Sequence, residues 1–189
     1  MEILKQRILK DGQALGIGIL KVDSFLNHQL DVGLLNEIGK EFHDRFSDVE
    51  ITKILTIEAS GIGIACMTAL HFNVPVVFAK KSEPSTMTDG AYEAEVFSFT
   101  KNKNYIVRVS RNFLDKEDKV LIIDDFLAKG GALQGLEEIV RQSGAKLVGA
   151  GIVIEKAFQE GGKALREKGV RIESLAVIQS IKDNDIKFY

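Results

Sequence analysis

The 189-residue sequence contains one cysteine, Cys66, and two prolines, Pro75 and Pro84. One cysteine cannot form an internal disulfide, so a small disulfide-stapled fold is excluded and a reducing compartment is expected. Cys66 lies in an apolar stretch, which favours a buried position over a reactive thiol. With few prolines and no Ser-, Gly- or Pro-rich linker, residues 1–189 are expected to form a single domain.

The sequence also lacks a strong charge of one sign and any long apolar run. Its formal net charge of −2 argues against a general nucleic-acid or membrane-surface binder. No apolar run approaches the roughly 20 residues of a membrane span, and the charged first seven residues do not resemble a signal peptide. We therefore expect a cytoplasmic protein with neither nucleic-acid nor membrane partners.

One continuous stretch, from Val120 to Ala132, combines a strand, an acid pair and a glycine turn. Residues 120–123 are apolar without period-two alternation, which predicts a strand covered on both faces, as in a parallel sheet. Asp124 and Asp125 follow at its carboxyl end, where such sheets bind ligands. Gly130 and Gly131 then precede a helical apolar pattern that runs to Gly144. Free amides at that helix N-terminus attract a phosphate.

The acid pair alone leaves two interpretations open. Adjacent side chains of an extended chain point to opposite sides, so Asp124 and Asp125 suit two different neighbours, such as vicinal sugar hydroxyls or a metal-bound water. The alternative is an ordinary strand-to-helix turn with an acidic cap. The residues alone do not decide between a ligand site and a structural turn.

The remaining pattern predicts an α/β fold with a parallel sheet of about five strands, helices on both faces, and the first thirty residues outside the sheet. The expected strands are 53–58, 74–79, 119–124, 146–154 and 171–177. The expected helices are 31–46, 59–71, the one after the glycine turn, and 162–168. Alternating residues within 80–111 predict an antiparallel hairpin. An irregular segment, 82–90, precedes this hairpin, and the two together are a candidate lid.

A second strand-to-helix loop runs from Glu58 to Gly63 and could hold another phosphate on its amides. It contains Gly-x-Gly, but Cys66 replaces the third glycine of a dinucleotide fingerprint, and Lys81 rather than an acid lies about twenty residues on. Nicotinamide or flavin binding is therefore disfavoured. Lys81 and the preceding lysine are either a basic pair near this loop or a solvated strand end.

Two further segments could recognise a planar ligand. Residues 18–29 mix apolar and hydrogen-bonding side chains, among them Leu20 and Asn27, and Lys156 follows a buried strand on the same edge as the acid pair. The Lys156 ammonium suits a keto oxygen of a purine. From the residues alone, an N-terminal strand packed on the domain and an ordinary Glu155–Lys156 pair are the favoured alternatives. The three histidines have no metal-site spacing, so no protein metal site is predicted.

An apolar strand, two aspartates and a small-residue glycine turn resemble the phosphoribosyl pyrophosphate signature of type I phosphoribosyltransferases. The resemblance implies that Asp124 and Asp125 are the catalytic acids and hold the ribose hydroxyls. It implies that Mg²⁺ binds mainly through phosphoribosyl pyrophosphate. The residues implied to bind the 5′-phosphate are Ala128, Lys129, Gly130, Gly131 and Ala132. The residues implied to contact pyrophosphate are Ser60, Gly61 and Lys81.

This sequence departs from the family pattern at two positions of the turn, where Lys129 and Ala132 replace threonines. Without those hydroxyls, the backbone amides are expected to carry more of the phosphate binding.

With residues 20–29 and 154–156 included, nearly the whole chain resembles the xanthine-using bacterial members of the family. That resemblance implies purine salvage, in which phosphoribosyl pyrophosphate and xanthine give xanthosine 5′-monophosphate and pyrophosphate. It further implies that Leu20, Asn27 and Lys156 contact xanthine, that residues 1–30 form a hood over the base, and that the enzyme is a homodimer. The alternatives are a transferase for another 6-oxopurine, guanine or hypoxanthine, and a non-catalytic sensor of phosphoribosyl pyrophosphate that regulates transcription.

Overall fold

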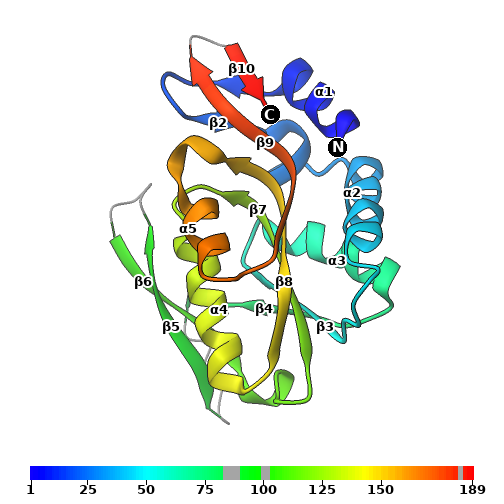
Figure 1. Ribbon diagram of the computed structural model, residues 1–189, viewed down its shortest axis with the longest axis vertical. Helices are drawn as coiled ribbons and strands as arrows, with labels where there is room; N and C mark the ends of the chain where they lie inside the picture. The colour runs from blue at the N-terminus through cyan, green and yellow to red at the C-terminus, as the bar shows by residue number, and fades with distance from the viewer. Residues whose placement is uncertain (83–89, 99–102, 183–184) are drawn as a thin grey trace.

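A computed structural model describes residues 1–82, 90–98, 103–182 and 185–189, and its centre is a twisted sheet. The strands lie in the order β10-β9-β8-β7-β3-β4 (Figure 1). They are β3 (Lys53–Ile57), β4 (Val76–Ala79), β7 (Lys119–Leu127), β8 (Lys146–Lys156), β9 (Ile172–Lys182) and β10 (Asp185–Phe188). All neighbours from β4 to β9 are parallel, and β10 is antiparallel to β9. The predicted parallel sheet of about five strands is confirmed, with one unpredicted edge strand.

Each face of the sheet has its own apolar core. Ile54 and Ile123 belong to a core with helices α2 (Val32–Arg45) and α3 (Gly61–Phe72). Leu55 and Ile122 belong to a second core with α4 (Gly131–Ser143) and α5 (Gly161–Glu167). Successive residues of one strand therefore enter opposite cores, which explains why the strands read as continuous apolar runs. No helix within the described ranges is long and apolar enough to cross a membrane.

The N-terminal residues form small elements, and the sequence predicted none of them except, as an alternative, an N-terminal strand packed on the domain. They are α1 (Glu2–Asp11), β1 (Gln13–Ala14), β2 (Leu20–Lys21) and a wide turn over Asp23–Asn27. Only Leu4 and Ile8 of α1 are buried, so its apolar stripe is too short to stand out in the sequence. These elements lie beside β9 and β10, where Lys5 Nζ donates to the Tyr189 carbonyl at 2.7 Å (Figure 1).

The predicted hairpin is present as β5 (Ala91–Ser98) and β6 (Lys103–Ser110), and β5 packs against α4. Residues 83–89 of the candidate lid segment and 99–102 at the hairpin turn lie outside the described residues.

Two local predictions were wrong. Cys66 is exposed rather than buried, because Ile64, Ala65 and Thr68 occupy the face of α3 that meets the sheet. β7 continues to Leu127, so the acid pair lies inside the last part of the strand rather than after it.

Candidate active site

The acid pair occupies the carboxyl-terminal part of β7. Asp124 is 5% exposed, and its Oδ1 accepts a hydrogen bond from the Asp125 amide at 3.0 Å. Burial raises the pKa of the Asp124 carboxyl well above its usual range, and the neighbouring Asp125 charge raises it further, while Lys81 opposes the shift. Among the residues that the structure describes, neither acid forms an ion pair. Within those residues, the charge of Lys81 acts on Asp124, but no cation is bonded to the acid pair.

The predicted phosphate loop follows directly. Ala128, Lys129 and Gly130 form the turn, and α4 begins at Gly131. Gly130 has φ of 85°, a left-handed conformation that favours glycine. Its carbonyl accepts the first helical bond, from the Gln134 amide at 2.9 Å, so the amides at the start of α4 have no acceptor within the helix.

A cavity of about 180 Å³ opens over this loop. All five residues predicted to bind the 5′-phosphate, 128–132, line it. Phe126, after the acid pair, and Tyr105, from β6, are also part of its wall. Burial and the nearby Asp124 charge raise the pKa of the Tyr105 hydroxyl. The turn, the strand end and the hairpin thus enclose one space beside the acids.

The second loop lies at the end of β3, where Ser60 and Gly61 begin α3. A Cβ placed on Gly61 would lie 2.1 Å from Thr56 Oγ1, so the close approach requires glycine. Thr56 Oγ1 is buried, and no hydrogen-bond partner for it is found in the described part of the chain. The Glu58–Ala59 peptide is cis. Glu58 Oε1 accepts the Lys81 amide at 2.5 Å, which fixes Lys81 beside the loop.

Lys81 also connects the second loop to the acid pair. Its Nζ lies 5.5 Å from the centre of the Tyr105 ring, and its charge acts on Asp124. The lysine is exposed to solvent and lies close to Tyr105, which is part of the cavity wall.

The residues predicted to recognise a base meet the same edge from the N-terminal side. Leu20 is 7% exposed on β2, and Asn27 Nδ2 donates to Asp125 Oδ2 at 3.3 Å. Lys156 Nζ donates to the Gly18 carbonyl at 3.0 Å and lies 5.3 Å from the centre of the Phe126 ring. Burial lowers the pKa of the Lys156 ammonium. Two hydrogen bonds thus tie the hood to the sheet edge.

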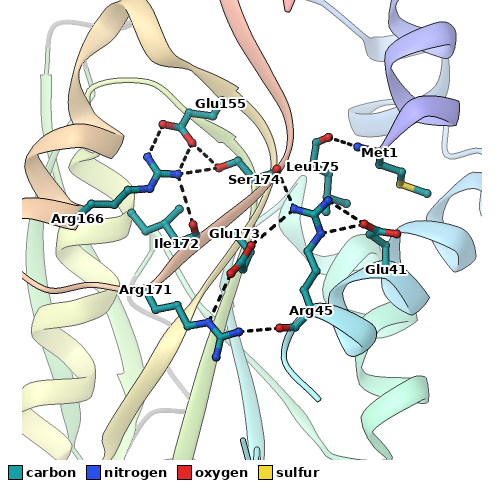
Figure 2. A network of polar contacts seen from close by, with 10 residues as sticks. All are labelled: Met1, Glu41, Arg45, Glu155, Arg166, Arg171, Ile172, Glu173, Ser174 and Leu175. Carbon is teal, nitrogen blue, oxygen red and sulfur yellow. Dashed lines mark hydrogen bonds and ion pairs between the residues drawn. The ribbon is translucent and has the colours of Figure 1, made fainter. Parts of the chain in front are cut away.

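Glu155 turns away from Lys156, so the alternative of an ordinary Glu155–Lys156 pair is wrong. Its carboxylate is 3% exposed and accepts two hydrogen bonds of 2.7 Å from Arg166 of α5, and a third bond from the Ser174 hydroxyl (Figure 2). Burial alone would raise the pKa of Glu155, but these hydrogen bonds and the Arg166 charge outweigh burial and lower it. Alternation along β8 sends the acid to α5 and leaves the lysine toward the hood.

Sequence reasoning missed Phe126 and Gly18 as parts of the site. Phe126 carried a usable signal, because an aromatic residue directly after the acid pair must lie near any ligand there. Gly18 contributes only its backbone carbonyl, which no side-chain pattern reveals.

The carboxyl edge of the parallel sheet thus brings together an acid pair, a glycine turn at a helix N-terminus and the N-terminal hood, an arrangement that suits a sugar phosphate. Residues 21–180 match the family model described as a phosphoribosyl transferase domain. The chain belongs to this family.

Relatives that align over nearly the full length of the chain are xanthine phosphoribosyltransferases. The chain is 64% identical to a xanthine phosphoribosyltransferase of Ruminiclostridium cellulolyticum, and the alignment covers 100% of this chain and 99% of the relative. It is 57% identical to that of Clostridium tetani, over 100% of both chains, and 55% identical to that of Staphylococcus aureus, over 98% and 97%.

Solved structures with similar folds are adenine phosphoribosyltransferases. The enzyme from Trypanosoma brucei has a TM-score of 0.76 and 21% identity, covering 92% of this chain and 78% of that one. The one from Giardia lamblia has a TM-score of 0.78 and 21% identity, covering 92% and 96%. Their identity is low, so they support the fold alone.

Proposed function

We propose that the chain transfers the phosphoribosyl group of phosphoribosyl pyrophosphate to xanthine, forming xanthosine 5′-monophosphate and pyrophosphate in purine salvage. One observation carries the proposal: the Asn27–Asp125 hydrogen bond joins the base-facing hood to the acid pair, which directly precedes the phosphate loop. A base, a ribose and a phosphate would meet these three parts in that order. Full-length relatives named xanthine phosphoribosyltransferase support the same reaction.

In this reaction no side chain forms a covalent bond to the substrate. A bond forms between a xanthine nitrogen and the anomeric carbon, the bond from that carbon to pyrophosphate breaks, and the nitrogen loses its proton. The anomeric carbon gains positive character on the way. Asp124 and Asp125 hold the ribose hydroxyls, and the amides of residues 129–132 hold the 5′-phosphate. Fixed positions and exclusion of water supply most of the rate enhancement.

Base choice follows from the donors and apolar surfaces at the hood. The Lys156 ammonium has three hydrogen-bond donors. One donates to the Gly18 carbonyl, so others are available for a keto oxygen of xanthine. Adenine would present an amino group, and a donor would then meet a donor. Leu20 and Phe126 offer apolar surface to the faces of the ring, and the Asn27 amide can read its edge.

The leaving pyrophosphate is assigned to the second loop, with Ser60, Gly61 and Lys81 as its contacts. The buried Thr56 hydroxyl behind Gly61, which has no hydrogen-bond partner among the described residues, supports a polar group at this position. Mg²⁺ is proposed to bind mainly through phosphate oxygens. The chain fits that role, since Asp124 and Asp125 carry the oxygen atoms that Mg²⁺ prefers as ligands. When bound, the ion neutralises charge on the leaving group.

The assembly and compartment are proposals as well. We propose a homodimer, since aliphatic side chains such as Ile17, which is 89% exposed, would leave water if a second copy covered them. A cytoplasmic location is proposed because the one cysteine, Cys66, is a free exposed thiol. Light scattering that gives the mass of one chain would contradict the dimer.

The direct test incubates the purified protein with phosphoribosyl pyrophosphate, Mg²⁺ and each purine in turn, following nucleotide formation. We expect xanthine to react with the highest kcat/KM, and Lys156→Met to lower that value while changing adenine turnover little. Equal rates with guanine or hypoxanthine would refute the xanthine preference. Binding of phosphoribosyl pyrophosphate without product from any base would favour the sensor.

A further inference from the structure

The first turn of α5 touches the back of the phosphate loop. The Gly161 amide donates to the Ala128 carbonyl at 3.1 Å. A Cβ on Gly161 would lie 2.3 Å from that carbonyl oxygen, 2.4 Å from the carbonyl carbon of Lys129 and 2.7 Å from the amide nitrogen of Gly130. All three atoms are backbone, so none can rotate away. Only glycine permits this close approach of the α5 backbone to the backbone of residues 128–130.

The contact extends along the same side of the loop. A Cβ on Gly130 would lie 3.1 Å from Leu165 Cδ1, so the buried Leu165 side chain of α5 packs against the loop as well. Glu160, just before α5, has φ of 60°, which costs a non-glycine residue of order 1 kcal/mol. Glu160 adopts this conformation directly before Gly161, whose amide donates to the Ala128 carbonyl.

An ion pair between the exposed Arg166 side chain and the buried Glu155 carboxylate fixes α5 to the sheet. Arg166 donates to both oxygens of Glu155, and Glu155 precedes the base-facing Lys156 on β8 (Figure 2). The Arg166 guanidinium also donates to the Ile172 carbonyl at 3.4 Å, at the start of β9. α5 is therefore anchored to two strands while its first turn contacts the loop.

We propose that Gly161 is a positioning residue for the phosphate loop. Its amide occupies the Ala128 carbonyl, and its lack of a side chain lets α5 support the backbone of residues 128–130. This support keeps the amides at the start of α4 directed at the 5′-phosphate. The inference rests on the proposed function, because it assigns the support to the site that binds phosphoribosyl pyrophosphate.

The test compares Gly161→Ala with Gly169→Ala. Gly169 lies just beyond the other end of α5 with φ of 91°, and a Cβ there would meet nothing within 4 Å. Gly169→Ala strains the backbone through its positive φ but meets no neighbour, whereas Gly161→Ala places a Cβ against the loop, so only Gly161→Ala displaces the loop. We expect Gly161→Ala to raise KM for phosphoribosyl pyrophosphate roughly tenfold or more over the control. KM for xanthine and the affinity for pyrophosphate should stay within about twofold of the control.

A second variant and a second readout guard against misfolding and against failure of the proposed reaction. Arg166→Met releases the anchor without entering the loop and should raise the same KM about threefold, a smaller share of the same misplacement effect. Hydrogen exchange at the Gln134 amide, which donates to the Gly130 carbonyl of the loop, needs no catalysis and should be faster in Gly161→Ala than in Gly169→Ala. Inactive wild-type protein would refute the transferase, whereas unchanged exchange and KM in both test variants would overturn only the role of Gly161.

Discussion

Each end of the neighbouring strands β3 and β7 has a threonine and an aspartate, and the two ends differ in the partners of these side chains. At the amino end, the Asp118 carboxylate accepts from Lys53 at 2.7 Å, from the Thr52 hydroxyl at 3.2 Å and from the Asp115 amide at 3.0 Å. At the carboxyl end, Asp124 has no cation bound to it among the described residues, and Thr56 Oγ1 has no partner there.

The difference distinguishes residues that stabilise the fold, at the amino end, from residues that we assign to the function, at the carboxyl end. Burial raises the pKa of Asp118, but its hydrogen bonds and the Lys53 charge outweigh burial and hold it below its usual range. The pKa of Asp124 is raised by burial and by Asp125. Unsatisfied polar groups cost folding free energy, so they persist where a ligand satisfies them. The amino end is a complete hydrogen-bonded network, and the carboxyl end is the one to which the proposed function assigns the ribose and phosphate groups.

The largest expected effect comes from removing the acids. Asp124→Asn combined with Asp125→Asn should lower kcat/KM for xanthosine 5′-monophosphate formation at least about 100-fold, because the ribose contacts are lost. Asp118→Asn, at the other end of β7, should leave kcat/KM of the folded protein within about threefold. Steady-state kinetics on samples with matched circular dichroism measures both. Retained activity in the double variant would end the comparison.

Stability should change in the opposite sense at the two ends. Asp118→Asn leaves Lys53 without its carboxylate partner, with only the Phe113 carbonyl remaining, and should lower the free energy of unfolding by about 1–3 kcal/mol. Asp124→Asn removes an uncompensated buried charge and should keep or raise stability by about 1 kcal/mol. For this chain length, each 1 kcal/mol corresponds to about 2–4 °C in Tm. Thermal unfolding of ligand-free protein decides the sign, and a large loss in Asp124→Asn would contradict it.

The two threonines give a smaller, matched test. Thr52→Val removes a hydroxyl that donates to Asp118 and accepts from the Lys119 amide, and it should destabilise by about 1–2 kcal/mol. Thr56→Val removes a buried hydroxyl without a described partner and should be neutral or stabilising. Chemical denaturation compares the pair. Equal losses at both positions would mean that Thr56 is satisfied in solution.

The smallest effect is a pH dependence. The raised pKa of Asp124 means that its destabilising charge is absent below the unfolded value and complete above the folded value. The Tm advantage of Asp124→Asn should therefore shrink as pH falls from 8 toward 4. The stabilising contribution of Asp118 is present above its unfolded pKa and is lost as pH falls through its lowered folded pKa. A constant Tm difference for Asp124→Asn across this range would argue against a shifted Asp124.

The sequence predicted the sheet because its buried strands are continuous apolar runs and its helices have clear periodicity or glycine boundaries. It also predicted the acid pair and residues 128–132, since a contiguous strand, turn and helix must lie together. Contacts between distant segments carry no such local signal. Asn27 meets Asp125 across 98 residues, and Lys156 meets Gly18 across 138.

Other features escaped prediction for different physical reasons. α1 buries only Leu4 and Ile8, which is too short a stripe to read as a helix. Gly161 matters for the backbone atoms that it approaches, and these belong to a loop some thirty residues earlier. Cys66 was placed in the core because α3 is apolar on most sides, which hides which face meets the sheet.

The most direct test of the account is a crystal structure of the protein with phosphoribosyl pyrophosphate, Mg²⁺ and an unreactive xanthine analogue. We predict the 5′-phosphate within hydrogen-bond distance of the amides of residues 129–132, the ribose hydroxyls on Asp124 and Asp125, and the base between Lys156 and the hood. A ligand bound elsewhere, with the carboxyl end of β7 unchanged, would contradict the assignment of this end to function.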